Sequence, residues 1–227
     1  RLSVFNMIKT KDYCAYVVDV DGTLYYQRWM QIQMALYLLS YYLLRPHRIK
    51  EILILYSYRK LRNGNTFAEA SNHEQLITQK LAQIYHRSEA QIQEIVREWI
   101  LTRPLQVLFS ARDQHLIAFL QKQSQDGKKV YIYSDYPAIQ KCDVLGISAD
   151  DIYWPDTSRI SVLKPSSKGL EYILQSNHLR PSDVLFIGDR MEKDGFCAQG
   201  ANVDYLILRR NRFSRWIQYK NLLKRGV

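Results

Sequence analysis

Short apolar runs alternate with longer amphipathic stretches over most of the chain. The stretches at residues 15–19, 129–135 and 184–189 begin with residues that are mostly apolar or β-prone on both faces and end in polar residues, which is typical of strands buried in a parallel sheet. Weaker runs at 151–154 and 203–208 predict two further strands. Helical patterns occupy the segments between strands, at residues 113–125, 137–145, 166–178 and 192–201. This alternation predicts an α/β fold with a doubly wound, parallel, Rossmann-like sheet.

Residues 27 to about 102 follow a different pattern. They carry almost no strand signal and predict four helices instead, at 27–44, 49–62, 69–86 and 88–101. Ser88 and Gln91 have the spacing of a capping box at the start of the last helix. We therefore expect an all-helical domain over residues 25–103, inserted into a core made of residues 1–24 and 104–208.

The end of the chain, residues 209–227, forms a third segment. It contains seven Lys or Arg residues and no acidic residue. Phe213, Trp216, Ile217 and Leu223 recur in it at roughly helical spacing. The pattern favours a terminal amphipathic helix that packs on the core. Contact of this basic tail with an anionic membrane surface or with nucleic acid is the alternative.

Carboxylates follow the first strand directly. Asp19 and Asp21 are two residues apart, so both side chains leave an ideal strand on the same side. Burying ionised carboxylates is costly unless they are paired or bind a cation, so they indicate a divalent cation or a nucleophile beside an acid. A plain turn at Asp21 and Gly22 is the alternative for this stretch alone. Ser134 and Asp189 end two other strands, and right-handed crossovers place all these ends at one edge of the sheet.

The net charge of the chain indicates the charge of its partners but not their class. The formal net charge of +10 favours anionic partners, namely phosphorylated metabolites, nucleic acid or a membrane surface, and solvated Lys and Arg side chains are the simpler account. Cys14, Cys142 and Cys197 lack metal-ligand spacing, so we expect buried free thiols in a reducing, cytoplasmic compartment. The most apolar run, residues 34–44, is too short to span a membrane, and no leader-peptide pattern opens the sequence.

Four motifs occur in order on the predicted core. The first is Asp19-Val20-Asp21-Gly22-Thr23, directly after an apolar strand. The others are Ser134 at a strand end, Lys164-Pro165 before a helix, and residues 188–194, which begin with Gly188-Asp189 and end with Asp194. Together they resemble the motifs of the haloacid dehalogenase-like (HAD) superfamily, chiefly its phosphatases, and the first is a full match to the DxDGT pattern of that family.

The resemblance implies phosphoryl transfer through a covalent intermediate. Asp19 would be the nucleophile that forms an aspartyl-phosphate, and Asp21 would be the general acid and then the general base. A Mg²⁺ ion would be held by Asp19, the backbone carbonyl of Asp21 and Asp189, with Asp194 holding it directly or through water.

The resemblance also implies a phosphate site. Ser134 would donate a hydrogen bond to a phosphoryl oxygen, and Lys164 would balance the negative charge and contact both nucleophile and phosphate. Thr23 and backbone N–H groups near Asp21 and Asp135 would complete the cradle.

The aspartate at position 21 favours one branch of the family. Carbon–halogen hydrolysis releases halide without a proton, whereas the alkoxide that leaves a phosphoester needs one, so Asp21 favours phosphoryl transfer. A phosphomutase would share all four motifs. The alternative of another class is a catalytically quiet HAD-like module that binds a membrane or a partner through its basic tail or its aromatic cap. Arg190 follows Asp189 where many relatives have a small hydroxyl residue; its side chain could add positive charge near the site or point outward, and we expect it to point outward.

The helical insert occupies the place of a cap over the active site in the resemblance. Tyr25, Tyr26 and Arg28 lie at its hinge, next to the expected metal site, and are candidates for contact with the leaving group. A full cap goes with a small phosphorylated substrate, and no nucleic acid partner is expected. The sequence names neither the substrate nor the oligomeric state.

Overall fold

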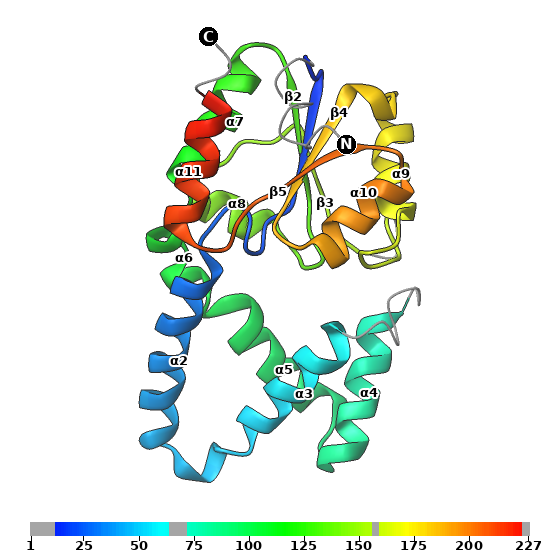
Figure 1. The fold of residues 1–227 in the computed structure, drawn as a ribbon. Coiled ribbons are helices and arrows are strands. Elements are labelled where there is room, and N and C mark those ends of the chain that lie inside the picture. The colour runs from blue at the N-terminus through cyan, green and yellow to red at the C-terminus, as the bar shows by residue number, and fades with distance from the viewer. Residues whose placement is uncertain (1–11, 64–71, 156–158, 224–227) are drawn as a thin grey trace.

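The computed structural model describes residues 12–63, 72–155 and 159–223. Parts of the expected core, insert and tail, at residues 1–11, 64–71, 156–158 and 224–227, lie outside the described residues. Figure 1 shows the sheet and its helices at one end of the molecule and the helical insert at the other.

The core is a parallel five-stranded sheet in the order β3-β2-β1-β4-β5. Its strands are β1 (Ala15–Val18), β2 (Lys129–Tyr133), β3 (Asp151–Tyr153), β4 (Val184–Gly188) and β5 (Asp204–Ile207). β1 lies at the centre, paired with β2 on one side and β4 on the other. All four residues of β1 are buried, as are those of β4, because helices cover both faces of the sheet. The predicted doubly wound α/β fold is confirmed.

Successive residues of β1 show how the sheet separates two helical layers. Tyr16 and Val18 belong to the apolar cluster that contains the buried residues of α7 (Gln114–Gln125) and α8 (Ile139–Leu145). Ala15 and Val17 belong to the cluster on the other face, with α9 (Lys168–Ser176) and α10 (Phe196–Gly200). Cys14, just before β1, is exposed, so the expectation of three buried thiols is wrong for this residue, because it precedes the covered part of the strand.

The insert between β1 and β2 is helical. It consists of α2 (Gln27–Leu43), the 3₁₀ turn η1 (Pro46–Arg48), α3 (Glu51–Asn63), α4 (His73–Tyr85), α5 (Glu89–Val96) and a π-helical segment, η3 (Arg97–Thr102). α3, α4 and α5 pack on one another, and the buried Trp99 ring stacks on Tyr42 of α2, with centroids 5.5 Å apart. Ser88 and Gln91 do form the predicted capping box of α5. Among the described residues, no helix is both long and apolar enough to cross a membrane.

Two features differ from the predicted elements. The short helix α6 (Leu105–Ala111), absent from the prediction, packs on α2 of the insert and on α8 of the core. The predicted helices at 88–101 and 192–201 each contain a wider π-helical part, η3 and η5 (Met191–Gly195). Hydrophobic periodicity does not reveal a single wide turn, because apolar residues still recur on one face.

The basic tail forms a helix, α11 (Arg212–Leu223), beside α7 (Figure 1). Arg215 and Gln218 are buried, whereas Phe213 and Trp216 are exposed. Gln218 accepts a hydrogen bond from the N–H of Arg209 and donates one to the carbonyl of Ile207, which fastens the helix to the end of β5.

Candidate active site

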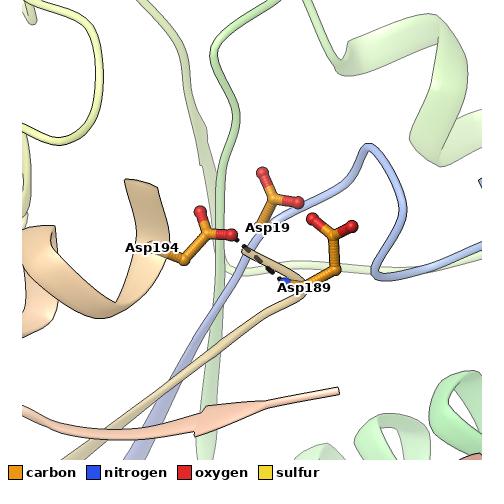
Figure 2. Close-up of side chains that lie close together, drawn as sticks. All are labelled: Asp19, Asp189 and Asp194. Atoms are coloured by element: carbon orange, nitrogen blue, oxygen red, sulfur yellow. Dashed lines mark hydrogen bonds between the residues drawn. The ribbon is translucent and has the colours of Figure 1, made fainter. Parts of the chain in front are cut away.

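Three carboxylates converge at the carboxyl end of the sheet. Asp19 follows β1, Asp189 follows β4, and Asp194 lies in η5, the π-helical turn after β4. One carboxylate oxygen of each lies within 4.8 Å of those of the other two (Figure 2). All three residues are buried. Parallel strands therefore bring together carboxylates that are far apart in the sequence, as expected at this edge of an α/β sheet.

Asp194 is fixed by hydrogen bonds to the turn that carries it. One of its oxygens accepts from the N–H groups of Asp189, at 3.2 Å, and Arg190, at 3.0 Å. A Cβ at Gly188 would lie 2.4 Å from the Cβ of Asp194, so only glycine lets the end of β4 approach this closely. Asp194 is thus positioned by backbone donors before any ligand binds.

Lys164 is the cation at the centre of the cluster. Its Nζ lies 2.5 Å from Oδ1 of Asp19 and 2.7 Å from Oδ1 of Asp194, and its side chain is buried. Burial opposes its charge, but Asp19, Asp194 and Asp135 outweigh burial and raise the pKa of Lys164 well above its ordinary value. Lys164 therefore stays protonated and holds the predicted nucleophile from one side.

Asp19 is held from its other side by Thr23, whose hydroxyl donates a hydrogen bond of 2.9 Å to Oδ2. Burial raises the pKa of Asp19 to about 8 even though Lys164 opposes the shift, and the carboxylates of Asp194 and Asp189 add to it. Three carboxylates around one lysine thus leave negative charge uncompensated.

Asp189 has cations near it but no donor in hydrogen-bond contact with one of its oxygens. Its Oδ2 is buried and has no hydrogen-bond partner among the described residues, and Nε of the exposed Arg210 lies 3.7 Å away. Burial, together with Asp194, raises the pKa of Asp189 to about 6. A Cβ at Gly22 would lie 2.5 Å from the same oxygen, so that glycine keeps the space beside it open. An orphaned oxygen in an all-oxygen cluster fits a hard divalent cation.

Asp21 lies beside this cluster and has its own partners. Both of its oxygens accept hydrogen bonds from Nζ of Lys141 in α8, at 2.6 and 2.8 Å. The hydroxyl of Tyr25 donates a third, at 2.5 Å. Burial opposes ionisation of Asp21, but Lys141 and Tyr25 hold its pKa below the ordinary value. Asp21 is therefore ionised in this arrangement.

A second buried ion pair lies next to the cluster, at the end of β2. Asp135 accepts from Nζ of Lys193 at 2.9 Å and from the backbone N–H of Lys164 at 3.1 Å. Burial opposes its charge, but Lys164 and Lys193 lower the pKa of Asp135. Ser134, the residue before it, is buried, and its Oγ accepts from the N–H of Tyr136, which leaves its own proton available for donation.

A cavity of about 160 Å³ joins these residues to the insert. Core residues and residues of α2, α3 and α6 line it together, so it lies between core and insert. Its charged lining consists of Asp19, Asp21, Arg59, Arg62, Asp135, Lys141, Lys164, Asp189, Arg190, Lys193 and Asp194. Its apolar lining includes Met30, Ile100 and Leu108. Thr23 and Ser134 are fully buried and do not line it.

The order and placement of these residues agree with one enzyme family. The sequence profile of haloacid dehalogenase-like hydrolases matches residues 14–201 of this chain. The chain belongs to this family. Members of the HAD family typically use a divalent metal ion, and the cluster of Asp19, Asp189 and Asp194 suits one. A comparison with curated proteins finds no match.

Solved structures share this HAD fold at low sequence identity. The 2-haloacid dehalogenase from Pseudomonas syringae pv. Tomato DC3000 has a TM-score of 0.60 and 12% identity, over 86% of each chain. YfnB from Bacillus subtilis, described as a HAD hydrolase bound to magnesium, has a TM-score of 0.63 and 18% identity, over 87% of this chain and 89% of that chain. A HAD phosphatase from Thermococcus onnurineus has a TM-score of 0.57 and 16% identity, over 87% of each chain. At these identities the likeness concerns the fold alone.

Sequence reasoning missed several residues of this HAD site. Lys141 and Lys193 lie on helices, where a lysine is usually solvated, and no spacing links them to Asp21 or Asp135. Of the three hinge candidates, Tyr25 contacts Asp21, whereas Tyr26 lies under the side chains of Arg212 and Arg215, and Arg28 is exposed.

Arg190 also differs from the prediction. It was expected to point outward, but it lines the cavity, and its charge lowers the pKa of Asp189 against the effects of burial and Asp194. The reason is its position directly after β4, at the same sheet edge as the carboxylates.

The C-terminal helix of this hydrolase holds the loop that carries the first motif. The Arg215 guanidinium donates to the carbonyls of Gly22 and Thr23, at 2.7 and 2.9 Å. It also pairs with the buried Asp113 at 3.0 Å, and Tyr219 donates to the same carboxylate at 2.8 Å. The basic tail thus contributes a buried arginine directly behind the loop that carries the first motif.

Proposed function

We propose that this HAD hydrolase is a Mg²⁺-dependent phosphatase that hydrolyses a small phosphorylated metabolite through an aspartyl-phosphate on Asp19. The observation that carries the proposal is the placement of Asp19 and Asp21 on one cavity with different partners. Lys164 and Thr23 hold Asp19, whereas Lys141 and Tyr25 hold Asp21. Two carboxylates in different environments can take different roles in one reaction.

The first step forms the covalent intermediate. A carboxylate oxygen of Asp19 attacks phosphorus, and the bond from phosphorus to the leaving oxygen breaks. Lys164 and Thr23 fix the direction of the Asp19 carboxylate during this attack. The leaving oxygen takes a proton through Asp21, and Nζ of Lys141, which donates to both oxygens of Asp21, supplies that proton.

The second step returns the enzyme to its starting state. A water molecule attacks the phosphorus of the aspartyl-phosphate and gives its proton to Asp21. The bond from phosphorus to Asp19 breaks, and inorganic phosphate leaves. Asp21 is ionised in the resting arrangement, so it is in the form that can accept this proton and pass it to Lys141. When bound, a Mg²⁺ ion held by Asp19 and Asp189, with Asp194 close by, would neutralise charge between carboxylate and phosphate.

Asp21 is also the reason to prefer phosphoryl transfer to dehalogenation. The structural neighbours include both a dehalogenase and a phosphatase, so the fold does not decide between them. Halide leaves carbon without a proton, so dehalogenation would not need a general acid at position 21. A phosphomutase remains the second candidate, because it differs only in whether water or a sugar accepts the phosphoryl group.

The cavity indicates the class of substrate. Its volume of about 160 Å³ suits a small molecule, and Arg59, Arg62 and Arg190 add positive charge to a lining that also has apolar residues. Such a lining supports a small anionic metabolite over a protein or nucleic acid substrate.

Phosphate release from p-nitrophenyl phosphate and from a panel of phosphorylated metabolites tests the proposal. We expect Mg²⁺-dependent release by the wild type and none by Asp19→Asn. Asp21→Asn should lose more activity on alkyl phosphates than on p-nitrophenyl phosphate, because p-nitrophenolate leaves without a proton.

Other outcomes separate the alternatives. Equal phosphate release by wild type and Asp19→Asn would rule out this mechanism. A sugar-phosphate isomer formed without free phosphate would identify a mutase, and chloride release from chloroacetate would identify a dehalogenase.

A further inference from the structure

The outer side of α2 is a continuous apolar stripe. Trp29, Ile32, Leu36, Leu39 and Leu43 recur at helical spacing, and between 50% and 77% of each is exposed. The opposite side of the same helix is also apolar, and there Met30, Met34 and Tyr42 are buried in the insert. A surface helix normally has one apolar side, so the outer stripe is not required for packing of the insert.

The stripe continues around the turn into α3. Leu44 is 79% exposed, Ile49 is 55% exposed, and Leu53 and Tyr56 of α3 are also exposed. Residues 29–56 thus form two helices joined by a turn, with exposed apolar side chains along both helices and at the turn. The turn lies at the end of the molecule away from the sheet (Figure 1). We call these exposed apolar residues of α2, the turn and α3 the hairpin surface. Exposed apolar side chains in this number mark an interaction site.

The charges carried by the two helices and the turn are nearly all positive. From residue 27 to residue 63 the chain has seven Lys or Arg residues and one acidic residue, Glu51, which is buried and paired with Arg48. Arg45, His47 and Lys50 are exposed at the turn, between Leu44 and Leu53. The guanidinium of Arg45 lies over the ring of Tyr41, 4.4 Å from its centroid, so it stays beside the apolar residues.

A second copy of the chain is a poor occupant of this surface. Antiparallel pairing of two α2 helices would place Arg28 of one copy near Arg45, Arg48 and Lys50 of the other. No acidic residue lies between positions 22 and 50 to offset them. Like charges at such an interface oppose association.

We propose that the hairpin surface binds the surface of an anionic lipid membrane. Exposed leucines, isoleucines and the Trp29 indole would enter the boundary between headgroups and acyl chains, and Arg45 and Lys50 would contact lipid phosphates. Apolar burial and attraction to anionic lipids are the two contributions that hold interfacial helices. The same positive charge that disfavours a second copy favours this partner.

Membrane contact through the hairpin leaves the active site free. The cavity is lined by Gln27, Met30 and Gln31, at the start of α2, whereas Leu43 and Leu44 lie at its end. At a rise of about 1.5 Å per residue, the two ends are on the order of 20 Å apart. In the basic tail, by contrast, the Arg215 side chain donates internal hydrogen bonds to the carbonyls of Gly22 and Thr23, so it is not available to lipid phosphates.

Co-sedimentation with lipid vesicles tests the proposal. We expect the wild type to bind vesicles of phosphatidylcholine with phosphatidylglycerol at low salt, and to bind phosphatidylcholine alone at least tenfold more weakly. Leu43→Ser/Leu44→Ser and, separately, Arg45→Gln/Lys50→Gln should each reduce binding at least tenfold. Because these residues do not line the cavity, both variants should keep the wild-type activity on p-nitrophenyl phosphate and the wild-type thermal transition, which shows that they are folded.

A variant of exposed aromatic residues on another helix is the control for vesicle binding. Phe213→Ser/Trp216→Ser removes an exposed aromatic pair from α11 and should leave vesicle binding unchanged. Loss of binding in this variant alone would assign the contact to the tail and overturn the proposal. Absence of vesicle binding by the wild type would overturn it as well. So would a wild-type dimer in light scattering that becomes monomeric in Leu43→Ser/Leu44→Ser without any binding of vesicles.

Discussion

At the scale of single residues, the carboxylate of Asp21 is held from two sides by the Lys141 ammonium and the Tyr25 hydroxyl. This environment favours the charged form of Asp21, although burial opposes it. Lys141 therefore sets the pH range in which Asp21 is ionised, and its removal should change that range.

Lys141→Gln should raise the pKa of Asp21 and move the acidic limb of the kcat profile, which includes the step where Asp21 acts as base, to higher pH. We expect kcat near neutral pH to fall on the order of 10- to 100-fold, the size of a general acid–base contribution. The measurement is a pH–rate profile with p-nitrophenyl phosphate. Lys128→Gln is the control, because Lys128 pairs with Asp12 at the surface. An unchanged acidic limb in Lys141→Gln would mean that Lys141 does not act on Asp21.

Asp189 gives a prediction about stability without metal. Burial and Asp194 raise its pKa to about 6, so ionisation of Asp189 destabilises the folded chain. The sign follows from linkage: the folded state holds a proton that the unfolded state loses, so this contribution to stability falls as pH rises from about 4 to about 6. Asp189→Asn should therefore increase the free energy of unfolding of the metal-free protein at pH 7, on the order of 2 kcal/mol.

The same substitution should remove the stabilisation that Mg²⁺ gives to the wild type, because it takes away a charged ligand. Thermal unfolding with EDTA and with added Mg²⁺ measures both effects. We therefore expect the Tm of Asp189→Asn to lie above that of the wild type in EDTA and below it with added Mg²⁺. A lower Tm of Asp189→Asn in EDTA would show that Arg190 and Arg210 offset the cost of burying the ionised Asp189.

At the scale of elements, α11 supports the catalytic loop through one arginine. Arg215 is buried and joins the carbonyls of Gly22 and Thr23 to Asp113. Removal of this cation leaves the Asp113 carboxylate buried among uncharged donors, including the Tyr219 hydroxyl and the backbone N–H of Leu116. Arg215→Met should reduce the free energy of unfolding by about 3 to 5 kcal/mol, the range for breaking a buried ion pair.

Urea denaturation checks this prediction, with Arg212→Met as the control on the exposed side of the same helix. The double variant Arg215→Met/Asp113→Asn should be less destabilised than the sum of the two single variants, because no buried charge then lacks a partner. Additive effects would indicate that the two residues stabilise the fold independently.

Elements differ in how well the sequence predicts them. β1, β2 and β4 are predictable because burial on both faces leaves uninterrupted apolar runs. α6 is not, because a helix of seven residues between Pro104 and Asp113 is too short for a repeating pattern, and its packing on α2 and α8 decides its conformation. Asp19 and Asp189 are predictable from their positions at strand ends, whereas Asp194 follows only from the resemblance of residues 188–194 to the fourth motif of the family. The pairing of Lys141 with Asp21 could not be found, since it joins residues 120 positions apart.

At the scale of the whole molecule, Arg62 joins the insert to the core across the cavity. It lies on α3, and its guanidinium donates to the carbonyl of Asp135 and stacks on Tyr136, 4.0 Å from the ring centroid. It also pairs with Glu74 of α4. Asp135 is in turn held by Lys193 and by the N–H of Lys164. One side chain of the insert thus contacts the group of residues that positions Lys164.

Arg62→Ala should therefore favour an open arrangement of insert and core. A cap closes a site to exclude water and to complete it around the substrate, so weaker closure should raise KM and lower kcat together. We expect kcat/KM to fall at least tenfold and the radius of gyration in small-angle X-ray scattering to increase. Lys60→Ala, on the exposed side of α3, is the matched control and should change neither quantity. A lower kcat/KM with an unchanged radius of gyration would instead assign Arg62 to substrate binding, because Arg62 also lines the cavity.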